Sequence, residues 1–356
     1  MEKNNPHPIF NENKLWGNNS NPLWLASTIS FFRNIEKYKF PAKLEADRRK
    51  QIVSLVSKEL LGIKELEKPT LLKAEDLSVL EKEYLVEHFL TTHNFHQAHS
   101  GEAFIVEEKG EFIATLNLRN HIQFEFIDTS GDLENAWNKL EKIETAIGKS
   151  VSYSYSPKFG FLTADPTQCG TALAVSVFLQ LSGLIHTEKV DEVLEKLAED
   201  NIEVKGIQGS PTEIIGDVLS VQNNYTLGIT EENILASLRS FTTKILVEEH
   251  AARSKIRQEG TPHIKDKVSR AFGILIHSYQ IEAVEALNAI SLLKLGMDLG
   301  WVQGITMAQL NQLFFNSRRA HLLCQLEGAE KITQEEIPHR RAEFIHRTLE
   351  SVKLSI

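Results

Sequence analysis

Cysteine and long apolar runs are both scarce in this chain. Its 356 residues include two cysteines, Cys169 and Cys324, and contain no run of 18 apolar residues. Two thiols exclude a disulfide framework and a cysteine-based zinc site, which indicates a reducing compartment and predicts a cytoplasmic protein. The first 22 residues are polar and rich in Asn and Pro, without the basic and apolar regions of a signal peptide. We therefore expect neither a membrane span nor export.

Basic charge is also limited. Lys and Arg number 39 against 48 Asp and Glu, the formal net charge is −9, and no block of basic residues occurs. A nucleic-acid surface requires clustered Lys and Arg, so nucleic acid is excluded as a main partner. A basic protein segment suits this charge better. The length and the 42% hydrophobic content allow a large core and two domains.

Apolar periodicity divides the chain into three parts. Residues 1–22 are predicted to be a polar tail, 23–258 an α+β domain, and 259–356 an all-helical domain, with Gly260 and Pro262 at the boundary. Alternating residues between 103 and 127, with a turn at Lys109-Gly110, predict an antiparallel sheet. Within the α+β domain we expect helices over 44–61, 75–90, 132–147, 188–199 and 231–258, and strands over 151–155, 160–163, 202–207 and 216–222.

The most distinctive segment is GFLTADPTQCGTALAVSV at 160–177. It resembles the phosphagen (guanidino) kinase signature, in which an aromatic-Leu-Thr run leads into Cys-Pro-Thr-Asn, a Gly-Thr pair and Arg-Ala-Ser-Val. The later segments KDKVSRAFGIL and LLKLGMDLGWV resemble the helical C-terminal domain of the bacterial protein-arginine kinases of the McsB type. The resemblance extends from about residue 23 to 349. It implies a phosphagen-kinase-like antiparallel sheet flanked by helices, followed by an all-helical domain.

The resemblance also implies where nucleotide phosphates would bind, because such kinases bring five arginines to them. The matching positions here are not arginines: they are Thr28, Ser30, Gln123, Ala174 and Lys205. Nearby family residues are kept at Arg33, Asn34, Asn117 and His121. Lys205 keeps one positive charge at these five positions, so four cationic side chains are lost. At roughly 1.5 to 3 kcal/mol for each charge-assisted hydrogen bond, that loss removes on the order of 6 to 12 kcal/mol. We therefore expect no cofactor, with ATP and Mg²⁺ required only if the chain is an active kinase.

The substrate guanidinium is held in this family by two carboxylates and a cysteine. The matching positions are Arg119, Ser210 and Asp165, with Glu213 kept nearby. Arg119 would repel a guanidinium. We predict that Arg119 and Asp165 form an ion pair, and that the guanidinium of Arg119 fills the vacated substrate site.

The family senses phosphoarginine through an Arg-Asp-x-x-Arg-Ala motif in the helical domain. Ile337 and Pro338 stand at its first two positions, whereas Arg341 and Ala342 keep the last two. This predicts loss of sensing, with dimerisation retained.

Three patterns have simpler explanations. His93, His96 and His99 are spaced like metal ligands, but their segment is loop-like, so no metal site is expected. Asp165 precedes a proline, which is typical of a turn or cap rather than a general base. The pairs Arg318-Arg319 and Arg340-Arg341 are interpreted as solvated helix faces.

Two functions remain open. The first is a pseudokinase that acts as a protein-binding scaffold, and the resemblance implies a homodimer working with a small zinc-binding protein of the McsA type and with Clp protease machinery. The alternative is an active protein-arginine kinase that transfers the γ-phosphate of ATP with a rearranged site containing Lys205, His121 and Asp165.

Overall fold

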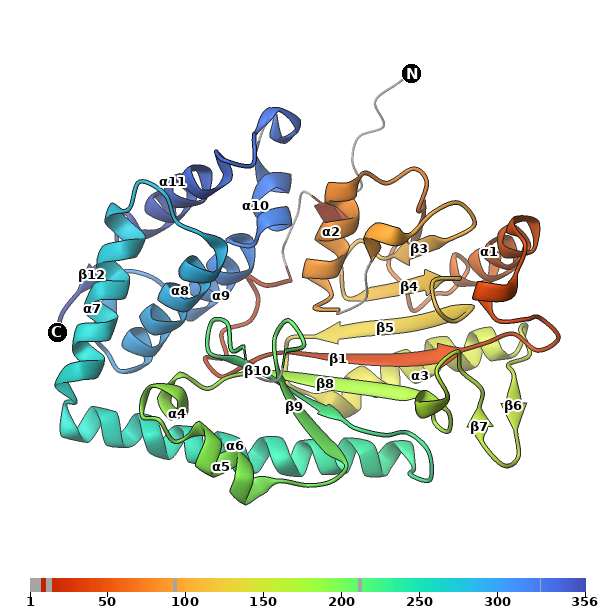
Figure 1. Cartoon of the computed structure of the whole chain (residues 1–356), viewed down its shortest axis with the longest axis horizontal. Helices are drawn as coiled ribbons and strands as arrows, with labels where there is room; N and C mark the ends of the chain where they lie inside the picture. The colour runs from red at the N-terminus through yellow and green to blue at the C-terminus, as the bar shows by residue number, and fades with distance from the viewer. Residues whose placement is uncertain (1–7, 11–14, 92–94, 211–212, 327) are drawn as a thin grey trace.

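A computed structural model describes residues 8–10, 15–91, 95–210, 213–326 and 328–356. Over these residues, eight strands form one antiparallel sheet in the order β2-β3-β4-β5-β1-β8-β10-β9 (Figure 1). The strands are β1 (Trp24–Arg33), β2 (Thr70–Lys73), β3 (Ala103–Val106), β4 (Phe112–Leu116), β5 (Ile122–Asp128), β8 (Leu173–Gln180), β9 (Ile202–Gly206) and β10 (Val218–Asn223). A short hairpin is separate from this sheet. Its two strands, β6 (Tyr155–Ser156) and β7 (Gly160–Phe161), have two residues each.

The helices of this part of the chain lie where the sequence predicts them, except for the five-residue α4, which was not predicted. They are α1 (Ala46–Leu60), α2 (Val79–His88), α3 (Leu133–Gly148), α4 (Ser182–His186), α5 (Val190–Leu197) and α6 (Glu231–Glu259). Local signals fix several of their ends. Ser78 and Glu81 form a capping box at α2, and Gly260 ends α6 in the left-handed conformation at φ 60°.

The sheet has one apolar and one polar face because side chains alternate along each strand. The apolar face packs on α3 and α6, which contact β1, β5, β8 and β10. Its core includes Ile29, Phe31, Phe124, Val175, Val177, Leu219 and Val221. The opposite face of the same central strands lines the candidate site.

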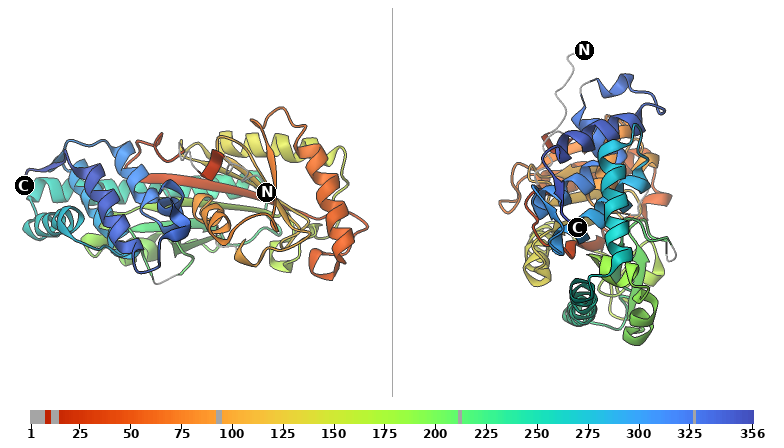
Figure 2. Two further views of the ribbon diagram at one scale, coloured as in Figure 1. Left: turned by 90° about the horizontal axis from the view of Figure 1, so that it is seen from above. Right: turned by 90° about the vertical axis from the view of Figure 1, so that its left-hand side faces the viewer.

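The C-terminal region is helical, as predicted. It contains α7 (Pro262–His277), α8 (Ala283–Asp298), α9 (Met307–Asn316), α10 (Arg319–Gln325) and α11 (Ile337–Leu349), with a two-residue ladder of β11 (Val302–Gln303) and β12 (Lys353–Leu354). Figure 2 shows these helices gathered at one end of the sheet. The mixed sheet-and-helix fold followed by a helical domain confirms the predicted fold class.

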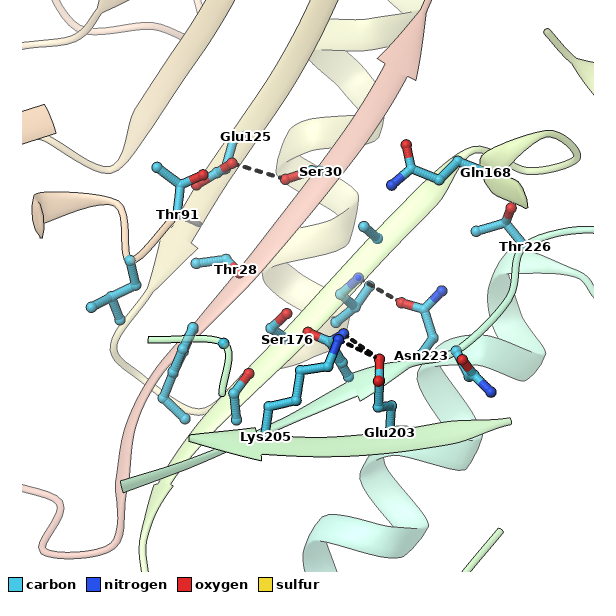
Figure 3. Close-up of a pocket in the computed structure, with 18 of the residues that line it drawn as sticks. Thr28, Ser30, Thr91, Glu125, Gln168, Ser176, Glu203, Lys205, Asn223 and Thr226 are labelled. Atoms are coloured by element: carbon cyan, nitrogen blue, oxygen red, sulfur yellow. Dashed lines mark hydrogen bonds and ion pairs between the residues drawn. The ribbon is translucent and has the colours of Figure 1, made fainter. Parts of the chain in front are cut away.

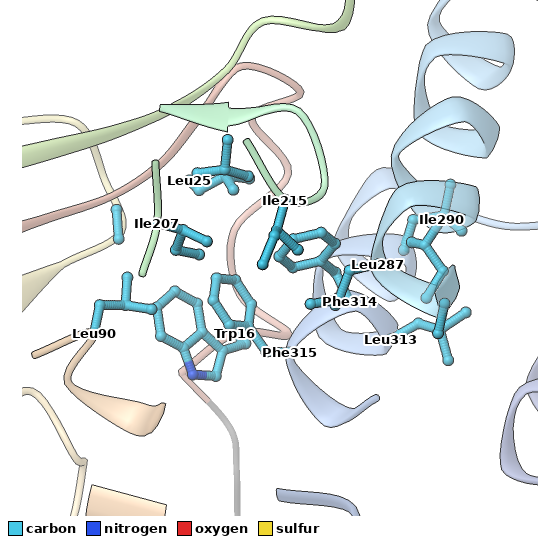
Figure 4. Packing of buried hydrophobic residues seen from close by; sticks show 14 of the residues in the cluster. Trp16, Leu25, Leu90, Ile207, Ile215, Leu287, Ile290, Leu313, Phe314 and Phe315 are labelled. Carbon is cyan, nitrogen blue, oxygen red and sulfur yellow. The ribbon is translucent and has the colours of Figure 1, made fainter. Parts of the chain in front are cut away.

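The predicted N-terminal tail differs from the expectation where the structure describes it. Trp16 is fully buried, and its ring stacks on Phe315 of α9 at a centroid distance of 3.5 Å (Figure 4). Ile9, Phe10 and Leu15 are also buried. These apolar residues are spaced too widely among Asn and Pro to form a periodic pattern, yet they join a core that includes both the sheet end and the helical domain.

Three strands of the large sheet, β1, β2 and β8, were not predicted as strands. The central strand β1 comes from a stretch without clear alternation, because Ser27 lies on its apolar face and Phe32 on its polar face. The edge strand β2 has four residues. Among the described helices, none has the length and apolar character needed to cross a bilayer.

Candidate functional site

The polar face of the sheet lines a cavity of about 520 Å³. Strand register explains why residues distant in sequence meet there. Ser30 of β1 lies between Glu125 of β5 and Ala174 of β8, and the next row joins Thr28 to Ser176. Lys205 of β9 enters the same face opposite Ser220 of β10. All five predicted phosphate-arginine positions thus line one cavity: Thr28, Ser30, Gln123, Ala174 and Lys205. Thr28, Ser30 and Lys205 are labelled in Figure 3.

This cavity carries little positive charge. Among its described lining residues, the charged ones are Glu125, Glu203 and Lys205. The Lys205 Nζ atom lies 2.7 Å from a carboxylate oxygen of Glu203, two residues earlier on β9. That contact partly neutralises the one cationic side chain. The remaining polar groups are hydroxyls and amides, which are weaker partners for a triphosphate than arginine forks.

Glu125 is a site residue that the sequence analysis missed. Its side chain is buried, with 5% of the residue exposed. Its Oε2 atom accepts hydrogen bonds from the Ser30 hydroxyl at 3.1 Å and the Gln123 amide at 3.0 Å, whereas Oε1 has no hydrogen-bond partner. Burial raises the pKa of Glu125 to about 7, against the opposing effect of those two hydrogen bonds. The sequence signal that could have identified Glu125 is its position. It follows Gln123 by two residues on the same strand, so the two side chains must lie on the same face of the sheet.

Arg119 and Asp165 lie together, but not as the sequence analysis envisaged. Arg119 Nη2 is 3.7 Å from Asp165 Oδ2, within ion-pair distance, while the two side chains are 59% and 32% exposed. Arg119 therefore does not fill an enclosed substrate site, and that part of the prediction is wrong. Arg119 lies in a loop and its guanidinium stays hydrated, so its ion pair with Asp165 contributes little to the stability of the fold.

Asp165 has a local structural role. It caps the short 3-10 helix Pro166–Gln168 by accepting hydrogen bonds from the Thr167 hydroxyl at 2.7 Å and the Thr167 amide at 3.1 Å. These bonds, more than Arg119, lower the pKa of Asp165. The contacts agree with the cap interpretation rather than with a general base.

Ser210, the third expected substrate position, is not among the cavity lining. It lies in the loop after β9, where its carbonyl accepts from the Gly206 amide at 2.6 Å and its hydroxyl accepts from the Glu213 amide at 3.2 Å. The neighbouring segment 206–209 does line the cavity. The structure therefore brings the five phosphate positions together in one cavity, but it leaves Asp165 on the loop before β8 and Arg119 on the loop between β4 and β5.

The kept residues Asn117 and His121 hold that loop in shape. Asn117 adopts φ 62°, and its amide donates to the carbonyls of Arg49 and Gly101, both at 2.9 Å. His121 Nδ1 accepts from the Ile35 amide, and Nε2 donates to the Lys39 carbonyl, each at 2.9 Å. Burial lowers the pKa of His121 to about 4, so the ring is neutral at physiological pH. Both ring nitrogens are occupied by backbone groups, which leaves no atom for catalysis in the alternative mechanism.

Arg33 and Asn34, kept beside this loop, are also engaged within the fold. Arg33 Nε donates to Glu144 at 2.6 Å, and its guanidinium lies over the Phe161 ring at 3.6 Å. Asn34 donates to Asn120 Oδ1 at 2.7 Å. These contacts join β1 to α3 and to the loop before β5.

The predicted sensing window opens α11. Ile337 is buried, and the Pro338 carbonyl accepts from the Ile281 amide at 3.1 Å. Arg341, with 2% of the residue exposed, donates to the carbonyls of Ser317 at 2.7 Å and Ile281 at 2.9 Å. The kept arginine therefore crosslinks segments of the helical domain.

The interpretation of the arginine pairs as solvated faces is wrong for two of the four residues. Arg341 is buried for the reason just given, and Arg318 donates to the Glu87 carbonyl of α2 at 2.8 Å. Arg319 contacts Glu83, and Arg340 pairs with Glu343 at 2.9 Å.

No metal centre is found within the described part of the chain, where no three His, Cys, Asp or Glu residues are placed to hold an ion. His93 lies outside the described residues, and the side chain of His96 is likewise not described. His99 contacts Glu102, with its Nδ1 atom 3.3 Å from the carboxylate.

Comparison with known proteins identifies the family. The family model for the ATP:guanido phosphotransferase C-terminal catalytic domain matches residues 51–252, and that for the protein-arginine kinase McsB C-terminal domain matches residues 261–355. The chain belongs to the protein-arginine kinase family. A protein-arginine kinase of Chlamydia pneumoniae is 31% identical over 333 residues, covering 92% of this chain and 91% of the relative. One from Bacillus cereus strain AH820 is 33% identical over 327 residues, covering 91% and 92%.

Solved structures show the same fold at lower identity. Lombricine kinase superposes with a TM-score of 0.58 at 19% identity, covering 71% of this chain and 74% of that one. The duplicated taurocyamine kinase of Schistosoma mansoni, with bound transition-state-analogue components, gives a TM-score of 0.57 at 21% identity. That match covers 64% of this chain and 33% of the longer, duplicated protein. At these identities the likeness establishes the fold alone.

Proposed function

We propose that this chain is a non-catalytic member of the protein-arginine kinase family, a pseudokinase that works by binding protein. The observation that carries the proposal is the charge of the cavity. Of the five positions where the family resemblance places phosphate-binding arginines, only Lys205 is cationic, and Glu203 lies 2.7 Å from it. Phosphoryl transfer depends on neutralising phosphate charge, and this cavity supplies almost none of that neutralisation.

A second observation concerns the nucleophile. An attacking guanidinium requires a nearby anion for binding and a group that takes up its proton. Arg119 stands at one of the expected carboxylate positions, Asp165 is engaged in capping, and both nitrogens of His121 bond backbone groups. The rearranged active site of the alternative hypothesis would have to use Lys205, His121 and Asp165, and each of them already has a partner within the fold.

The alternative, an active protein-arginine kinase, has support of a different kind. The relatives at 31 to 34% identity are named protein-arginine kinases, and they match this chain over nearly its whole length. By relationship alone, that name favours an active enzyme. The proposals differ in one measurable property, because an active kinase must bind Mg-ATP in the cavity.

The test is a calorimetric titration of the full chain with Mg-ATP, combined with mass spectrometry for phosphoarginine on an arginine-rich protein. The Bacillus cereus relative serves as the positive control. We expect no saturable ATP binding and no phosphoarginine above a reaction without enzyme. Saturable binding together with phosphoarginine formation would establish the active kinase and overturn the pseudokinase proposal.

For partners, we propose a homodimer that binds a small zinc-binding protein of the McsA type and Clp protease machinery in the cytoplasm. Support comes from the family resemblance, from the matched C-terminal domain, and from a net charge of −9 that suits basic segments. Size-exclusion chromatography with light scattering tests the dimer. Co-purification with an McsA-type protein tests the complex, and a monomer that binds no such protein would contradict this part of the proposal.

A further inference from the structure

We propose that the cavity on the sheet is a binding site for a small organic cation, whose ammonium or guanidinium group is held by Glu125. This inference goes beyond the pseudokinase proposal, because it assigns the cavity a ligand instead of only excluding one. It rests on the carboxylate of Glu125, which lines the cavity without an ion-pair partner among the described residues, and on the character of the surrounding side chains.

The carboxylate of Glu125 has unused hydrogen-bonding capacity. Its Oε2 atom accepts from Ser30 and Gln123, whereas the buried Oε1 atom has no partner. A buried acceptor left without a donor costs about 1 to 3 kcal/mol. A cationic group in the cavity would balance the negative charge of this carboxylate, and the cavity of about 520 Å³ has room for a small molecule.

The other lining groups favour the same kind of ligand. Hydroxyl and amide groups approach from three further strands, at Thr28 of β1, Ser176 of β8, and Ser220 and Gln222 of β10. The segment 206–209 lines the edge beside Lys205. With Lys205 paired to Glu203, Glu125 is the charge in the cavity that has no ion-pair partner among the described residues. An anionic ligand would face that carboxylate, whereas a cation would be attracted to it.

The test uses two cations with a matched neutral probe. Putrescine carries two ammonium groups, agmatine carries one ammonium and one guanidinium group, and 1,4-butanediol has the length of putrescine without its charge. We expect calorimetry on the full chain to show saturable binding of at least one cation and none of the diol. The comparison between putrescine and agmatine identifies which cationic group Glu125 prefers.

Variants test whether Glu125 holds the ligand. Glu125→Gln keeps the shape of the side chain and removes its charge, and we expect affinity to fall roughly 10- to 150-fold, the range for a hydrogen bond to a charged group. Glu107→Gln is the matched control, because Glu107 is another buried carboxylate of the same domain and does not line the cavity. Ala174→Phe leaves Glu125 intact but fills the cavity, and it should also abolish binding.

Two results would overturn the inference. One is the absence of saturable cation binding by the wild-type chain at concentrations up to about 10 mM. The other is equal cation affinity in the wild-type, Glu125→Gln and Ala174→Phe proteins. Mg-ATP titrated in parallel separates the two proposals. If the chain binds no ATP, failure of the cations to bind overturns this inference alone. Saturable ATP binding together with phosphoarginine formation contradicts the pseudokinase proposal.

Discussion

The buried carboxyl of Glu125 should make the stability of this protein depend on pH in a direction opposite to the usual effect of acidic residues. Its pKa is raised to about 7 in the folded protein, against a usual value of 4.5. Below pH 4.5 the group is protonated in both states and has no effect. Between pH 4.5 and 7 the folded state retains the proton that the unfolded state releases, so stability falls as pH rises. At about 1.4 kcal/mol for each pKa unit, the full loss is about 3 kcal/mol above pH 7.

Glu125→Gln removes this titration while preserving the size of the side chain. We expect the variant and the wild type to be about equally stable near pH 4.5, and the variant to be more stable by up to about 3 kcal/mol near pH 7.5. Urea unfolding followed by tryptophan fluorescence at both pH values measures the difference. Glu232→Gln, at an exposed position on α6, is the control and should leave the pH dependence unchanged. An identical pH dependence in wild type and Glu125→Gln would refute the assignment of a buried, ionisable Glu125.

Three further predictions concern the rest of the fold. Arg119→Ala should change the free energy of unfolding by less than about 0.5 kcal/mol, because its ion pair is exposed. Asp165→Ala should lower the free energy of unfolding by about 1 kcal/mol, because the cap hydrogen bonds that Asp165 accepts from Thr167 are lost. Equal effects of the two variants in urea unfolding would contradict this prediction. Trp16→Ala should destabilise the protein by about 3 to 5 kcal/mol in the same assay, and an effect below about 1 kcal/mol would show that the N-terminal segment does not join the core. Because burial lowers the pKa of His121 in the folded protein to about 4, the stability of the fold should decline as pH falls from 6.5 towards 4. His121→Gln should reduce that decline when it is followed by thermal melting. An unchanged dependence of the melting temperature on pH would count against a buried neutral ring.

The fold was largely predictable for segments whose hydrophobic period and length both indicate the same type of element. The periods of 44–61, 132–147 and 231–258 correspond to α1, α3 and α6, whose apolar faces pack on other elements. The central strand β1 was not predicted, because it packs against neighbours on both sides and one face combines Thr28 and Ser30 with Phe32. Trp16 was not predicted to be buried, since its partner Phe315 is about 300 residues away in sequence and no local pattern encodes that contact.

The sequence predicted which residues form the candidate site, but it did not predict which of them are buried. Family resemblance placed Thr28, Ser30, Gln123, Ala174 and Lys205 together, and strand register brings all of them to one face. Resemblance could not distinguish an enclosed arginine from a hydrated one, so the prediction that the guanidinium of Arg119 fills the vacated substrate site was wrong. It also gave no reason to single out Glu125, which corresponds to none of the motif positions and is defined by its neighbours across β1 and β5.

The cavity wall and the junction between the domains share residues, which bears on how a ligand could act without catalysis. Leu90, after α2, and Ile207, after β9, line the cavity and also belong to the buried core that contains Trp16. In Figure 4 they lie on the sheet side of that core, with Leu287, Leu313 and Phe314 of the helical domain on the other side. A ligand that orders the wall at Leu90 and Ile207 therefore acts on side chains in the core that connects the sheet to the helical domain.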